Sequence, residues 1–167
     1  MSAVFDRARV TLVLADYAAA DAVQKLNILG AGWSITGLNP ATGTTSPMSL
    51  VIMIDSPPEQ YGDEFSLTLT LEDSNGSLIQ VPDAAGSLSP LRIAQVVRIQ
   101  EPTFLPQLNV PKGKLWAHTQ TVLNFPNGVP LPPGGIFTWK VEIDGETRDG
   151  WNISFFVPGP PSPVVFG

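Results

Sequence analysis

A run of eight residues near the middle of the chain reads Phe65-Ser66-Leu67-Thr68-Leu69-Thr70-Leu71-Glu72. Apolar side chains occupy every second position, and polar or acidic side chains occupy the positions between them. Successive side chains of a β-strand point to opposite faces of the sheet. The alternation therefore predicts a strand with one face in the core and one face in water. Asn75-Gly76, a favoured hairpin turn, then predicts a return into Ser77–Val81.

Further strands are expected on both sides of this run. Ile136–Ile143 and Trp151–Val157 alternate in the same way, and Asp144-Gly145 forms the turn between them. Met48–Ile54 is almost continuously apolar, which is typical of a strand covered on both faces. The other strand candidates are Arg9–Ala15, Lys25–Ile35, Leu91–Gln100 and Leu115–Phe125, and Ala18–Val23 is expected to form a short helix or a loop.

Composition supports an all-β class. Of the 167 residues, 17 are proline and 15 are glycine, and only 14% are charged, which disfavours a helical bundle. We predict one antiparallel β-sandwich of about eight strands, Ig-like or jelly-roll-like, with Pro-rich loops. The predicted domain spans residues 1–157, and residues 158–167 form an extended, Pro-rich C-terminal arm.

Charge and residue usage exclude several classes of function. The net charge is −6, and no cluster of Lys and Arg is present, so we expect no binding to nucleic acid. The chain has no cysteine, which excludes thiolate metal sites and cysteine nucleophiles. The apolar run Val10–Ala15 is short and is followed by Asp16, so we expect no signal peptide, transmembrane segment or membrane partner.

The sequence gives little support for an enzyme. His118 is the single histidine, and no Gly-x-Ser-x-Gly motif accompanies it, so a surface or interface role is favoured over catalysis. Paired carboxylates in loops can bind calcium, but each loop offers only two or three acids, and turn chemistry alone explains Asp73-Ser74-Asn75-Gly76 and Asp144-Gly145. The pairs are Asp63 with Glu64, Glu72 with Asp73, and Asp144 with Glu146. We predict no catalytic residue, metal or cofactor.

The four tryptophans divide by their position in the strand pattern. Trp139 and Trp151 fall on the apolar phase of their strands and are predicted to lie in the core. Trp33 is ambiguous. Trp116 is out of phase with Leu115 and with the apolar positions that follow, which makes it the best candidate for an exposed aromatic that contacts a partner. His118 shares its face and is the second candidate.

The C-terminal arm supplies the remaining candidates for partner binding. Its prolines suit neither a helix nor the interior of a sheet, yet it continues into the apolar residues Val164, Val165 and Phe166. A solvated linker is one interpretation. The other is an arm laid over a neighbour, since proline lowers the entropy lost on ordering. We favour the arm.

Two segments carry a resemblance to a known family. Val10–Asp16 forms a strand ending in Leu-Ala-Asp, and Lys25–Gly37 contains Gly30-Ala31-Gly32-Trp33. This opening resembles that of an uncharacterised family of small β-sandwiches from actinobacteria and their tailed phages. Pro132–Gly135, a strand, and then Asp144-Gly145-Glu146 are similar to the closing hairpin of that family. The resemblance implies a phage or prophage context. The family has no established catalytic residues, so none is transferred to this chain. This chain differs from the family pattern in its long Pro-rich tail.

Together these observations favour a non-enzymatic structural or assembly protein. The first expectation is an accessory component of a phage virion, a head decoration or minor capsid protein assembled in the host cytoplasm. Its partners would be the major capsid or another virion protein and further copies of itself, as a homo-oligomer. A minor tail protein and a stand-alone module that binds carbohydrate or another surface ligand are the alternatives, and fold class alone does not separate them.

Overall fold

A computed structural model describes residues 2–103 and 106–159 of the chain. The protein is mostly antiparallel β-structure, with 51% strand and 6% helix, which confirms the all-β class. Within the described ranges there are several sheets and none closes into a barrel. The strands are β1 (Arg9–Ala15), β2 (Tyr17–Ala20), β3 (Leu26–Leu29), β4 (Leu38–Asn39), β5 (Thr44–Thr45), β6 (Met48–Ser56), β7 (Glu64–Asp73), β8 (Gln80–Pro82), β9 (Leu88–Pro90), β10 (Arg92–Arg98), β11 (Ala117–Phe125), β12 (Gly135–Ile143) and β13 (Asn152–Val157).

One of the two larger sheets has the order β1-β6-β11, with β6 in the centre. Leu50, Ile52 and Ile54 of β6 are buried in the core. Ser49 and Val51, which point the other way, are also buried. The β2–β3 hairpin packs on that outer side, where the backbone N–H of Ala18 donates to the Ser49 hydroxyl at 3.1 Å. The predicted burial of this strand on both faces is confirmed.

The other large sheet has the order β10-β7-β12-β13, with β7 and β12 inside it. The apolar positions of β7 from Phe65 to Leu71 are buried, as their alternation predicts. The expectation of a fully wet opposite face is wrong, because Thr68 and Thr70 are also buried. Lys140 of β12 lies opposite Thr70 and makes an ion pair with Glu72, two residues further along the same face of β7, whereas Glu142 lies opposite Thr68.

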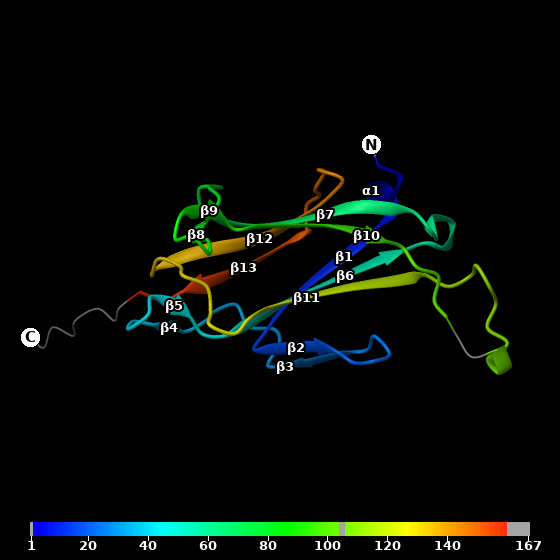
Figure 1. The fold of residues 1–167 in the computed structure, drawn as a ribbon, viewed down its shortest axis with the longest axis horizontal. Helices are drawn as coiled ribbons and strands as arrows, with labels where there is room; N and C mark the ends of the chain where they lie inside the picture. Colours follow the sequence, from blue (N-terminus) through cyan, green and yellow to red (C-terminus); the bar gives the residue numbers. More distant parts are fainter. Residues whose placement is uncertain (1, 104–105, 160–167) are drawn as a thin grey trace, which may run out of the picture.

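The two large sheets share one core, as the layered arrangement in Figure 1 shows. Phe125 of β11 and Trp139 of β12 stack across it, with ring centroids 5.5 Å apart. Trp139 is fully buried and Trp151 nearly so, which confirms the core placement predicted for both. Trp33 is half-buried and meets the ring of Phe155 edge-on.

Some local expectations are wrong. Residues 17–20 form β2, not a helix or loop, because Tyr17 to Ala20 pair with Leu29 to Leu26 of β3. A short helix, α1 (Ala3–Arg7), precedes β1 and was not expected. Ser2 caps it by accepting hydrogen bonds from the N–H groups of Val4 and Phe5. No helix in the described part of the chain has the length and apolar character needed to cross a membrane.

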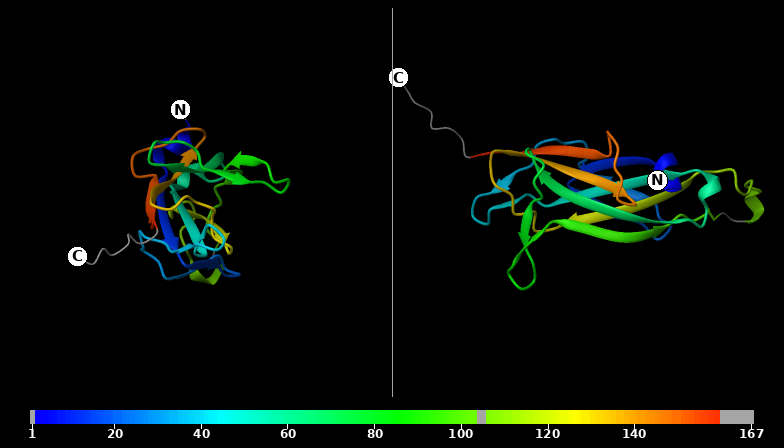
Figure 2. Two further views of the ribbon diagram at one scale, coloured as in Figure 1. Left: turned by 90° about the vertical axis from the view of Figure 1, so that its left-hand side faces the viewer. Right: turned by 90° about the horizontal axis from the view of Figure 1, so that it is seen from above.

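The described residues of the connection between β10 and β11 lie at the opposite end of the molecule from the end of β13 (Figures 1 and 2). β13 ends at Val157, whose carbonyl accepts a hydrogen bond from the Gly134 N–H just before β12. The described chain continues to Gly159. Residues 160–167, which make up most of the predicted arm, lie outside the described residues.

Asp144 in the β12–β13 turn joins the N-terminal helix to the sheet. Its carboxylate accepts hydrogen bonds from the Ser2 hydroxyl and from the N–H and hydroxyl of Ser66. Partial burial opposes ionisation, but these three hydrogen bonds outweigh it and lower the pKa of Asp144 below its ordinary value of 3.8.

Asp144→Asn is expected to lower the free energy of unfolding by about 1 kcal/mol or less at neutral pH, because the carboxylate is exposed to solvent. Because the pKa of Asp144 is lower in the folded state than in the unfolded state, the ionised carboxylate stabilises the protein at pH values above the unfolded-state pKa. This stabilisation is lost as the pH falls through the folded-state pKa. The difference between wild type and variant should therefore be constant at neutral pH and shrink below about pH 4. Urea unfolding across this pH range measures it. A difference independent of pH would contradict the role of the charge.

Candidate functional site

The candidate site lies at the end of the molecule opposite the end of β13. Two adjoining pockets open there, of about 580 and 420 Å³, and they share Pro102 and Leu115. Their walls come from the start of β1, the end of β6, the turn before β7 and the connection between β10 and β11.

The smaller pocket is built on one row of the three-stranded sheet. Arg9 of β1 and His118 of β11 both pair with Asp55 of β6, so the three residues stand side by side. The Nδ1 atom of His118 lies 2.7 Å from Oδ1 of Asp55. The guanidinium of Arg9 lies over the ring of Trp116, with its Cζ atom 4.5 Å from the ring centroid. The row thus places a carboxylate between two basic side chains beside a half-buried indole.

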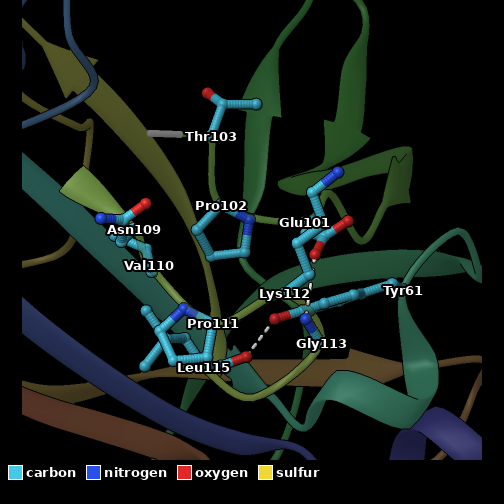
Figure 3. Close-up of a pocket in the computed structure, with 10 residues that line it drawn as sticks. All are labelled: Tyr61, Glu101, Pro102, Thr103, Asn109, Val110, Pro111, Lys112, Gly113 and Leu115. Carbon is cyan, nitrogen blue, oxygen red and sulfur yellow. Dashed lines mark hydrogen bonds between the residues drawn. The ribbon is translucent and has the colours of Figure 1, made fainter. Parts of the chain in front are cut away.

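The larger pocket is lined by the β10–β11 connection and by the turn before β7 (Figure 3). The Tyr61 hydroxyl donates a hydrogen bond to the carbonyl of Leu115, next to Trp116 in the sequence. The N–H of Gly113 donates to Oε1 of Glu101 at 3.1 Å. These two bonds tie the connection to the turn and to itself, and so give the pocket a defined wall.

Tyr61 keeps its proton over the physiological range. Its partial burial, together with the nearby carboxylates of Glu101 and Glu59, raises the pKa of its phenol above the ordinary value of 10.0. The neutral phenol is the form that donates to the Leu115 carbonyl. Tyr61 thus adds no charge to the surface that joins the two pockets. This surface consists of Tyr61, Leu115, Pro102 and Trp116, and all four side chains are uncharged.

Several polar groups of the site are engaged with one another, and Lys112 and Asn109 also line the larger pocket. Asp55 bonds to His118, Arg9 covers one aromatic ring, and Glu101 accepts from a backbone N–H. Such internal pairing leaves an apolar, aromatic surface rimmed by polar groups, which is the composition of a binding surface.

The structure brings two of the predicted partner-binding residues together and leaves three outside the described residues. Trp116 and His118 line the same pocket, and His118 is exposed as predicted. Val164, Val165 and Phe166 lie beyond Gly159, outside the described residues. Whether any of the five contacts a partner stays a prediction.

Sequence reasoning missed Arg9, Asp55 and Tyr61. Arg9 and Asp55 are 46 residues apart in the sequence. Only the register of the strands brings them into one row with His118. No local pattern carries that register. Tyr61 follows Pro57-Pro58, a turn signal, but nothing near it indicates that its hydroxyl reaches the β10–β11 connection.

Loop acids have structural partners. Asp73 accepts hydrogen bonds from the N–H groups of Asn75 and Ser77, and Asp144 binds Ser2 and Ser66 as described above. Asp21 and Asp83 each accept from the N–H groups two and four residues later, as Asp73 does. In the described ranges no three His, Asp or Glu side chains gather as a metal site would require.

Trp116→Ala is expected to cost about 1 kcal/mol, because the ring is half exposed and its stacking with Arg9 is a surface cation–π contact. Trp139→Ala is the matched comparison and should cost about 3–5 kcal/mol, since that ring is fully buried. Urea unfolding followed by far-UV circular dichroism measures both. Equal losses in the two variants would place Trp116 in the folding core and contradict a free binding surface.

Comparison with known proteins identifies a family. A search of curated proteins finds no match to this chain. Residues 10–156 match a family described as "Family of unknown function (DUF6941)". The match runs from the second residue of β1 to the residue before the end of β13, so it covers nearly all of both large sheets and every residue that lines the two pockets except Arg9. The chain therefore belongs to the DUF6941 family, whose function is unknown.

Proposed function

We propose that this protein is a non-enzymatic structural protein of a phage virion, a head decoration or minor capsid component. Its partners are a capsid or other virion protein and further copies of itself, and they include neither nucleic acid nor membrane. A minor tail protein has the same physical requirements and is the closest alternative. The proposal places the protein in the virion after assembly in the host cytoplasm.

One observation carries the proposal: the apolar surface of Tyr61, Leu115 and Trp116, beside which Asp55 pairs with His118 and Glu101 accepts from a backbone N–H. A catalytic site needs polar groups free to act on a substrate. A protein interface needs a desolvated aromatic centre with a polar rim, and Trp and Tyr are enriched at such centres. This surface has the second composition.

The strand order supports an Ig-like sandwich over a jelly roll. Counted along the chain, the seven strands of the two larger sheets have the orders first-second-fifth and fourth-third-sixth-seventh. Ig domains likewise place strands A, B and E in one sheet and C, F and G in the other. By analogy of fold alone, the pockets lie at the end that carries the B–C and F–G loops, which bind antigen in antibody variable domains.

The phage context rests on the resemblance of Val10–Asp16 and Lys25–Gly37 to a family of actinobacteria and their tailed phages. The low share of charged residues and the small rigid fold suit a component that packs on a larger lattice.

Carbohydrate binding is the second candidate, and the pocket of about 420 Å³ favours it. A half-exposed indole with a carboxylate, an imidazole and a guanidinium beside it offers a stacking face and hydrogen-bonding groups to a sugar. Titration calorimetry with a panel of oligosaccharides tests this candidate, and saturable binding that Trp116→Ala removes would favour it.

The virion role predicts that the protein is present in stoichiometric amounts in particles purified from the strain that encodes it. Quantitative mass spectrometry against the major capsid protein measures the ratio. Trp116→Ala should lower incorporation by about tenfold or more, as expected for an interface hot spot. Tyr17→Ala removes an exposed aromatic of β2 that is absent from both pockets and should leave incorporation unchanged.

Two results would contradict this assignment. Particles that lack the protein would exclude a virion component. Particles that contain Trp116→Ala at the wild-type level would exclude the pocket end as the contact with the virion.

A further inference from the structure

We propose that the apolar surface of Tyr61, Leu115, Pro102 and Trp116 binds the Pro-rich C-terminal segment, residues 158–166, of a second copy of this chain. The contact joins the pocket end of one copy to the tail end of the next. This inference rests on the proposed function, because it names one partner of an assembly protein.

The surface suits a proline-rich ligand. Pro-rich segments dock in grooves lined by aromatic side chains, because the polyproline II conformation is already restricted before binding. Here Trp116 and Tyr61 flank Leu115, and Pro102 lines both pockets. The β10–β11 connection closes the larger pocket as a wall fixed by the Tyr61 and Glu101 hydrogen bonds (Figure 3).

The segment suits the surface in composition. It reads Pro158-Gly159-Pro160-Pro161-Ser162-Pro163-Val164-Val165-Phe166 and carries no charged side chain. Prolines three residues apart, as Pro160 and Pro163 are, fall on one face of a polyproline II helix. An uncharged ligand brings no charge of its own that binding would desolvate, and Asp55 and Glu101 beside the surface already have hydrogen-bond partners.

The segment starts at the far end of the molecule. Val157, just before it, pairs with Gly135 at the start of β12, and two residues later Phe137 pairs with Asp73, the last residue of β7. Tyr61 precedes the other end of β7. The full length of β7, ten residues or about 33 Å, therefore separates the root of the segment from the pocket end.

That distance excludes the copy's own pocket. Gly159 lies beside Gly134, just before β12, so the described chain has not advanced toward the pocket by that residue. Phe166 follows Gly159 by seven residues, which reach at most about 25 Å even when fully extended. The apolar residues Val164 to Phe166 thus fall short of the pocket of the same chain, and a second copy has to supply them. A contact between two different surfaces is heterologous, so it builds a ring if the rotation closes and a filament if it does not.

A nearer surface competes for the same segment. Ile136 and Ile35 both pair with Phe156 beside the root, and all three side chains are exposed. Folding of the segment onto this surface of its own copy is the alternative that the experiment has to separate from binding in the second copy.

Complementation between two full-length variants tests the proposal. Trp116→Ala damages the pocket and keeps the segment, and Val164→Ser with Phe166→Ser damages the segment and keeps the pocket. Sedimentation velocity should show that wild type self-associates and that each variant alone is monomeric at the same concentration. An equimolar mixture of the two should form a heterodimer and stop there, because one intact pocket and one intact segment remain. Tyr17→Ala, the surface control, should associate as wild type does.

Each other result overturns the proposal. Wild type that stays monomeric, association that survives both variants, or a mixture that forms no heterodimer excludes the contact. A melting temperature lowered by the segment variant, with association intact in Trp116→Ala, assigns the segment to Ile35, Ile136 and Phe156 of its own copy. Monomeric protein that is stoichiometric in virions refutes this contact alone, whereas self-associating protein that is absent from virions refutes the virion role alone.

Discussion

Burial of the apolar side chains of β6 and β7 in one shared core is the constraint on which the rest of the structure depends. Each is an interior strand of its own sheet, and the apolar side chains that the two strands contribute to this core have almost no exposure to solvent. Both β1 and β11 pair with β6, and both β10 and β12 pair with β7, so the positions of six strands depend on these two. The stacked pair of Phe125 and Trp139 closes the same core from the neighbouring strands.

Patterns confined to one segment predicted most of the fold. Alternation in Phe65–Leu71 and in Ile136–Ile143, and the apolar run Met48–Ile54, placed the correct side chains in the core. The sequence was less informative where pairing between distant segments decides the outcome. Residues 17–20 form a strand because β3 pairs with them, and Thr68 and Thr70 are buried because β7 is an interior strand.

The candidate site was half predictable for the same reason. Trp116 and His118 could be singled out because an aromatic that is out of phase and a single histidine are visible locally. Arg9 and Asp55 join them through the register of β1 and β11 on β6, which no segment encodes alone. The row of Arg9, Asp55 and His118 is thus a product of the three-stranded sheet, whereas the Pro-rich composition of the C-terminal segment is visible in the sequence alone.

The position of β6 also has a consequence for biosynthesis. Its two neighbours are β1, near the start of the chain, and β11, which ends at Phe125, so the three-stranded sheet is incomplete until about three quarters of the chain has left the ribosome. β7 likewise waits for β12. Proteins dominated by such distant pairings fold slowly, because the chain loses the entropy of loop closure before the stabilising contacts form. During synthesis the apolar strand Met48–Ile54 therefore lacks one of its two neighbours until β11 has been made, and chaperones that shield nascent chains would find a target there.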